Sequence, residues 1–157
     1  MAQLMFAVFA ERVSVDQFNN ILDVHNVIEQ LQVPEPSPAA LAKAREAKKP
    51  AGLSARFALL LHWRRAIPSK PEGVIRQRVQ FCSPTGDVLS SAEMEFNLRL
   101  APYARNVIWF NALPLAGEGT YTFRVAIKAG KQWRAAGKTS YELLYQKSAT
   151  GQKVRLQ

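Results

Sequence analysis

The stretch Gly119-Thr-Tyr-Thr-Phe-Arg-Val-Ala-Ile127 decides the fold of this chain. Large apolar residues occupy every second position, and mostly polar residues lie between them and directly after. The apolar set is Tyr121, Phe123, Val125 and Ile127, and the other set is Thr120, Thr122, Arg124, Ala126 and Lys128. Because successive side chains of a strand point to opposite faces, the pattern predicts a strand with one buried and one solvated face. Ala129-Gly130-Lys131 then predicts a turn into a second strand. A lone hairpin is only marginally stable, so the pattern also requires a facing sheet.

The same alternation recurs in short segments along the rest of the chain. We expect strands over residues 4–15, 21–33, 55–65, 74–82, 88–98, 106–112, 133–136 and 138–145. Residues 21–33 should pair back on 4–15 as a long hairpin, and residues 55–65 should turn Phe57, Leu59, Leu61 and Trp63 toward the core. No strand–helix alternation is present. The pattern therefore predicts an all-β, two-layer antiparallel β-sandwich, immunoglobulin-like or related.

One segment departs from this pattern. Three prolines within residues 34–38 exclude a central strand. Ser37 is a suitable N-cap, Pro38 suits the first helical position, and residues 39–49 are strong helix formers. Leu41 is the only large apolar residue of this segment, so we expect a short peripheral helix in an insertion at about 37–49. The rest forms a single domain over residues 1–147, followed by a basic C-terminal tail over 148–157.

Two local features refine the sandwich. Tyr121, just after Gly119 at the start of a strand, resembles the tyrosine corner of immunoglobulin-like domains, and an ordinary core tyrosine is the alternative. In the hairpin that turns at residues 83–87, Arg76 and Arg78 should face Glu93 and Glu95. Such exposed pairs contribute about 0.2–1 kcal/mol each and help to set strand register.

The composition is that of an ordinary globular protein, with 48% hydrophobic and 21% charged residues in a chain of 157. Cys82 is the single cysteine, which excludes an intramolecular disulfide and suits a reducing compartment. We therefore expect a cytoplasmic location. No run of 18 apolar residues occurs, so we expect neither a membrane span nor a membrane partner.

The positive charge of this protein is concentrated in the last third of the chain. Residues 1–98 carry 11 Lys/Arg and 10 Asp/Glu, whereas residues 99–157 carry 10 Lys/Arg and only Glu118 and Glu142. A basic surface favours an anionic partner such as nucleic acid, and a solvated face that maintains solubility is the alternative.

The sequence offers little support for catalysis. It contains no Gly-x-Ser-x-Gly elbow and no glycine-rich loop before a helix, and Cys82 has no catalytic signature around it. Asp23 and His25 lie two residues apart and could begin a metal site, but no third ligand is near them in the sequence. We expect no enzyme activity, no cofactor and no bound metal.

Nucleic-acid binding has more support from the residue pattern. The candidate anion-binding or nucleic-acid-binding residues are Arg124, Lys128, Lys131, Trp133, Arg134 and Lys138. Cations neutralise phosphates and aromatic rings stack on bases, so a basic face with an interleaved tryptophan suits single strands. In the alternative interpretation the lysines protect a sheet edge from other chains and Trp133 belongs to the core.

Three segments of the chain form a further pattern. They are Val13-Ser14-Val15-Asp16 with Ile21-Leu22-Asp23-Val24 running to Val33-Pro34, then Ser83-Pro84-Thr85-Gly86, and finally Gly119-x-Tyr121-x-Phe123. Together they resemble a family of uncharacterised bacterial proteins with a domain of unknown function. The insertion after Pro34 and the long final segment depart from the family pattern. The resemblance implies a small sandwich fold and brings no catalytic residue to this chain.

Two hypotheses about function follow. The first is a non-enzymatic interaction module, such as a subunit of a bacterial or phage assembly, that binds a partner protein or a second copy through a sheet edge or loops. The second is a nucleic-acid-binding protein that uses the basic C-terminal third. Binding to unrelated oligonucleotides, titrated with salt, separates the two.

Overall fold

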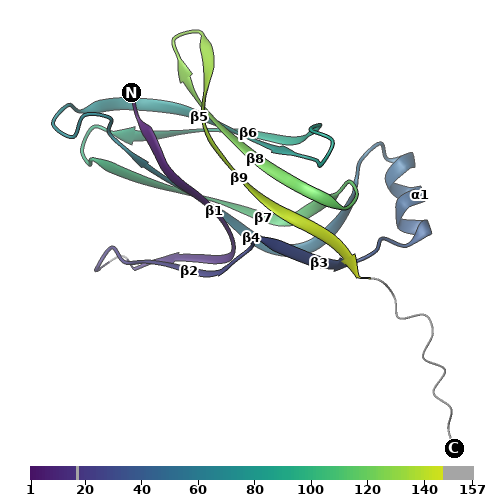
Figure 1. Cartoon of the computed structure of the whole chain (residues 1–157). Coiled ribbons are helices and arrows are strands. Elements are labelled where there is room, and N and C mark those ends of the chain that lie inside the picture. Colours follow the sequence, from purple (N-terminus) through teal and green to yellow (C-terminus); the bar gives the residue numbers. More distant parts are fainter. Residues whose placement is uncertain (17, 147–157) are drawn as a thin grey trace, which may run out of the picture.

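The computed structural model describes residues 1–16 and 18–146, which form two packed β-sheets (Figure 1). The four-stranded sheet has the order β2-β1-β4-β7, from β1 (Gln3–Val15), β2 (Leu22–Val27), β4 (Ala51–Arg64) and β7 (Tyr103–Leu115). The five-stranded sheet has the order β3-β9-β8-β5-β6, from β3 (Gln30–Pro34), β5 (Glu72–Cys82), β6 (Val88–Leu98), β8 (Gly119–Ala129) and β9 (Gln132–Gln146). The predicted all-β sandwich is confirmed.

Three strands of each sheet follow an order found in immunoglobulin-like sandwiches. Strands β1, β4 and β7 are neighbours in one sheet, and β5, β8 and β9 are neighbours in the other. These two sets match the A–B–E and C–F–G strands of immunoglobulin-like domains. In the described residues all strand pairs are antiparallel except β3 with β9, which is parallel. Strand β6 pairs with β5, so the outer edge of β7 has no neighbouring strand among residues 1–16 and 18–146.

Aromatic rings from both sheets fill the core. Every second residue of β8 is buried, as the alternation in residues 119–127 predicts. The ring of Phe123 lies 4.7 Å from that of Phe81 in its own sheet and 5.0 Å from that of Phe9 in the facing sheet. Tyr141 of β9 stacks on Phe9 at 4.9 Å. The buried face of β8 therefore joins the two layers.

Tyr121 forms the corner that its position suggests. Its hydroxyl donates to the carbonyl oxygen of Gly117 at 2.8 Å and accepts from the backbone N–H of Ala116 at 2.7 Å. The side chain is fully buried, and Gly119 beside it has a φ of +128°, a left-handed value that favours glycine. The tyrosine-corner interpretation is confirmed, because the bonds run back to the backbone a few residues upstream.

Replacing Tyr121 with phenylalanine should lower the free energy of unfolding by about 1–3 kcal/mol, since two backbone groups lose their partner in a buried site. Denaturant unfolding followed by tryptophan fluorescence measures the change. Tyr103→Phe removes the same hydroxyl from a side chain that is 55% exposed and serves as the matched control. Equal losses in both variants would show that the corner bonds do not stabilise the fold.

The prediction of one strand over residues 21–33 is wrong. Strand β2 ends at Val27, and the chain then crosses to the opposite sheet, where β3 runs parallel to β9. Ile28 makes the crossing: its N–H donates to the carbonyl oxygen of Phe9 at 2.8 Å, and its side chain enters the core. Asn26 just before it has a φ of +53°, which bends the strand. Apolar alternation continues through the crossing, so the pattern alone does not reveal it.

The tip of the β1–β2 hairpin curls back over the outer face of the four-stranded sheet, to which both of its strands belong (Figure 1). A second buried cluster joins Ala10 and Val13 of β1 to Ala58 and Leu60 of β4, with Leu22, Val24 and Val107 packed against it. Arg105 of β7 donates to both the carbonyl oxygen and the side-chain oxygen of Asn20, at 3.0 and 2.9 Å. The hairpin tip therefore reaches across β4 to β7, which buries both faces of β4 at residues 58–61.

The predicted peripheral helix is confirmed as α1 (Pro38–Glu46), and none of its residues is buried. The hydroxyl of Ser37 accepts from the N–H of Ala40 at 3.2 Å and caps it. The helix ends before the predicted residue 49 because Lys48 adopts a φ of +50°. The predicted basic tail over 148–157 lies outside the described residues. Residues 133–136 and 138–145, predicted as separate strands, belong to the single strand β9.

Candidate binding surfaces

The solvent side of the five-stranded sheet gathers cations around one indole. Arg124 lies opposite Lys138, Lys128 lies opposite Trp133, and Arg78 of β5 lies beside them opposite Ala126. Arg124, Lys128 and Lys138 are exposed, whereas Arg78 and Trp133 are half-buried. We call these five residues the basic face. Arg78 comes from the near-neutral first part of the chain, so charge distribution along the sequence does not reveal its role.

None of the four cations of the basic face forms an ion pair with a carboxylate in residues 1–16 or 18–146. The predicted pairing across the β5–β6 hairpin is formed by Arg76 alone, at 3.1 Å from Glu93 and 3.6 Å from Glu95. Arg78 has Glu93 as its strand partner but directs its guanidinium elsewhere. The basic face therefore has a positive charge that the surrounding carboxylates do not pair.

Trp133 is neither a core residue nor an open stacking platform. The guanidinium carbon of Arg78 lies 4.5 Å from its ring centroid, and the ammonium nitrogen of Lys128 lies 5.8 Å away. A cation within about 6 Å of an indole face is held by the ring quadrupole. The tryptophan thus positions two cations on the sheet, and a nucleic acid base would have to displace one of them to stack there.

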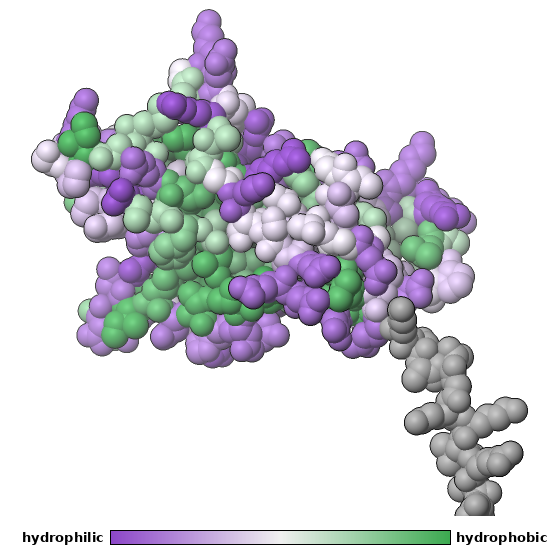
Figure 2. All heavy atoms as spheres, in the orientation of Figure 1, coloured by the Kyte–Doolittle hydropathy of each residue, from purple (hydrophilic) through white to green (hydrophobic). Residues whose placement is uncertain are grey.

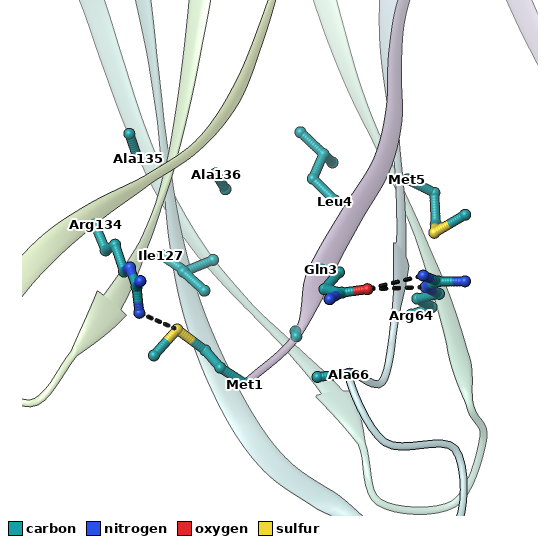
Figure 3. Close-up of a pocket in the computed structure, with 11 residues that line it drawn as sticks. Met1, Gln3, Leu4, Met5, Arg64, Ala66, Ile127, Arg134, Ala135 and Ala136 are labelled. Carbon is teal, nitrogen blue, oxygen red and sulfur yellow. Dashed lines mark hydrogen bonds between the residues drawn. The ribbon is translucent and has the colours of Figure 1, made fainter.

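Two of the six predicted residues do not belong to the basic face. Lys131 lies in the turn after Gly130, beyond the end of the strands. Arg134 pairs with Ile127 and turns to the other side of the sheet, where its Nη1 lies 3.9 Å from the sulfur of Met1 (Figure 3). There it lines a hollow of about 610 Å³ between β1 and the β8–β9 hairpin.

A β-bulge in β9 explains why Trp133 lies on the basic face and Arg134 does not. Val125 pairs with Gly137 but Ala126 pairs with Ala135, so β9 contains one extra residue at this point. A shift of one residue exchanges the two faces of a strand. Without the bulge Arg134 would lie opposite Lys128 and Trp133 would point to the core side. Nothing in the local sequence marks an extra residue except Gly137, where an added Cβ would lie 2.8 Å from Leu4 of β1.

The outer edge of β7 is a second candidate surface. Its core-side residues Ile108 and Phe110 are half-buried, whereas their partners on β4, Leu59 and Phe57, are 0% and 5% exposed. The core is therefore incompletely covered along this edge. Arg105 is the only charged residue of the strand, and Asn20 holds its guanidinium.

An aromatic row on the outer face of the four-stranded sheet leads to this edge. His62 stacks on Phe6 with ring centroids 4.9 Å apart and contacts Tyr103 of β7 at 5.6 Å. Phe6 and Tyr103 are 41% and 55% exposed. Met5, Val15, Ile21 and Val27 are also exposed, and Figure 2 shows hydrophobic atoms gathered over β1 and β2 in the lower part of the view. This apolar surface is of the kind that protein partners cover.

Partial burial, together with the nearby charge of Arg105, lowers the pKa of His62 below its ordinary value of 6.5. The native state therefore binds a proton less readily than the unfolded chain. As pH falls through 6.5 the unfolded state gains protons first, so stability decreases there and levels off below the native pKa. Titration of the imidazole by NMR should give a midpoint under 6.5, and Arg105→Gln should raise it. A midpoint above 6.5 would contradict this environment.

The described part of the chain contains no group of three or more His, Cys, Asp or Glu residues placed to hold a metal ion. Asp23 and His25 both lie on β2, where Arg12 approaches the His25 ring at 3.4 Å. Cys82 is buried, as expected for a packed residue at the end of a strand. No helix within residues 1–16 and 18–146 is long and apolar enough to cross a membrane. Comparison with protein-family models and with curated proteins gives no match to this chain.

Proposed function

We propose that this protein is a non-enzymatic interaction module that binds an extended segment of another protein chain along the outer edge of β7. The open edge of this strand, with core residues half-covered beneath it, is the observation that supports the proposal. Strand addition at a sheet edge is a recurrent mode of protein recognition, in which main-chain hydrogen bonds provide affinity and alternate side chains provide specificity.

Two contributions to the binding free energy favour the addition of a strand to β7. An added strand pairs backbone N–H and C=O groups along an edge that spans Tyr103–Leu115. It also covers the exposed parts of Ile108 and Phe110, and each Å² of apolar surface removed from water contributes about 25 cal/mol. The segment that fits should therefore alternate, with apolar side chains facing the core side.

Selection from a library of linear peptides tests this proposal. We expect the intact protein to enrich peptides in which apolar and polar residues alternate. These peptides should not bind the Ile108→Lys variant, because a charge at this position opposes strand pairing at the edge. Val88→Lys places the same charge on β6, the edge strand of the other sheet, and should retain binding. Failure to enrich any sequence over the Ile108→Lys variant would overturn the proposal.

The basic face supports a second candidate function, the binding of single-stranded nucleic acid. Four cations that form no ion pair within the described part of the chain project from neighbouring strands, in an area that the phosphates of one nucleic acid strand can follow. Because Trp133 is engaged by Arg78 and Lys128, we expect phosphate contacts rather than base stacking to dominate. Binding of this kind is insensitive to sequence.

Oligonucleotide binding measured by fluorescence anisotropy should weaken with salt. Four phosphate contacts predict a slope of about −3 in log affinity against log salt concentration. The double variant Arg124→Glu/Lys138→Glu should abolish detectable binding at physiological salt. Arg45→Glu/Lys48→Glu makes the same charge change at the C-terminal end of α1 and should have a much smaller effect. No binding of the intact protein at low salt, or equal losses in the two variants, would eliminate this candidate.

A further inference from the structure

The edge strands of the two sheets differ in how they are protected against other chains. β6 carries Glu93 and Glu95, and β3 is only 5 residues long and ends in a proline. β2 has 6 residues and carries Asp23 and His25. β7 has 13 residues, with a single cation near one end and Pro114 near the other. Charges, prolines and short length are the devices that block edge-to-edge pairing, and the middle of β7 has none of them.

The middle of β7 is chemically complementary to itself. Residues 106–110 place Ile108 and Phe110 on the core side and Val107 and Trp109 on the outer side. Antiparallel pairing of two copies follows a two-fold axis perpendicular to the sheet, which keeps core side beside core side. Centred on Ile108, it sets Phe110 of each copy beside Asn106 of the other, and Val107 beside Trp109. A strand from another protein would need a sequence that matches this pattern of side chains, whereas β7 of a second copy already has one.

The charge carried by β7 itself permits this pairing in spite of the high net charge, and the Arg56 guanidinium of β4 is held on the Trp109 ring, 4.3 Å from its centroid. Arg105 lies three residues from Ile108, so the two arginines would stand six residues apart, about 20 Å at the rise of a strand. That separation exceeds the Debye length of about 8 Å at physiological salt. The cations of the basic face lie on the other sheet, away from the contact.

We propose that two copies of this chain form a closed dimer by antiparallel pairing of β7, which joins their four-stranded sheets into one sheet of eight. The inference rests on the proposed use of the β7 edge and names its occupant. Because the two-fold axis is perpendicular to the sheets, the two basic faces lie on the same side of the dimer. Self-repulsion between two chains of charge +9 opposes association, so added salt should strengthen the dimer.

Sedimentation equilibrium over a hundredfold range of concentration tests the dimer. We expect the mass to rise from 17.5 kDa toward twice that value and to stop there. Ile108→Lys and Asn106→Lys should each weaken association at least tenfold, while Val88→Lys should not. Asn106 is already polar and is only half-buried, so a lysine there should disturb the fold less than one at Ile108. Asn106→Lys therefore still tests the contact if Ile108→Lys unfolds.

Three results would overturn this inference. They are a single-chain mass at every concentration, a dimer that both β7 variants leave unchanged, and growth beyond two chains. None of them bears on binding of a foreign strand, because the peptide selection, carried out with dilute protein, measures binding to a different partner. Enriched peptides with a strictly monomeric protein would retain the proposed function and eliminate the second copy as its partner.

Discussion

Replacing Phe123 with alanine is expected to lower the free energy of unfolding by about 3–5 kcal/mol. The side chain is fully buried, and its ring lies within 5.4 Å of the rings of Phe9, Phe81 and Phe110. It thus contacts three other strands and both layers. A cavity at this site removes packing from both sheets at once. Domains of this size are stable by about 5–15 kcal/mol, so the variant would lose a large fraction of its stability.

Urea unfolding of Phe123→Ala, with the slope of the transition held in common with the unsubstituted protein, gives this loss directly. Thr122→Ala is the matched control from the same strand. Thr122 lies on the solvent side, where its hydroxyl contacts that of Ser140 at 3.0 Å, and its loss should cost less than about 1 kcal/mol. Similar losses in the two variants would mean that β8 does not direct its apolar residues into the core.

Replacing Leu60 with alanine should cost about 2–5 kcal/mol, although Leu60 points away from the main core. The side chain is 0% exposed because the β1–β2 hairpin covers it with Val13, Leu22 and Val24. The substitution leaves a cavity between the sheet and the hairpin. This large effect distinguishes a hairpin that covers the outer face of β4 from one that extends freely into solvent.

Val27→Ala is the control for Leu60→Ala, since Val27 belongs to the covering hairpin but is 57% exposed. Its loss should stay within about 0.5 kcal/mol, as for most surface substitutions. A cost below 1 kcal/mol for Leu60→Ala, measured by the same urea titration, would show that the hairpin does not cover the outer face of β4.

The two-sheet architecture could be predicted because period-two alternation is a local property of each strand. The face of Phe123, the corner at Tyr121 and the capped helix after Ser37 all follow from residues within a few positions of each other. The crossing at Ile28 and the fold of the hairpin over Leu60 depend on contacts between segments far apart in the sequence. Apolar alternation is the same whether a strand continues, changes sheet or covers another strand.

The candidate surfaces show the same division between local and distant information. Arg124, Lys128, Trp133 and Lys138 come together because β8 and β9 form a hairpin, which the sequence indicates. Arg134 is excluded by one extra residue in β9. The contribution of Arg78 depends on the pairing of β5 with β8, which are separated by 36 residues of intervening chain. The open edge of β7 depends on the sheet to which β6 belongs, which no local pattern specifies.

Amide hydrogen exchange along β7, compared between dilute and concentrated protein, tests the central claim most directly. We predict that exchange slows in the middle of Tyr103–Leu115 as concentration rises, and that β6 shows no such change. Equal exchange in β7 at both concentrations, under conditions where sedimentation detects association, would contradict the account, because the contact would then lie elsewhere on the molecule.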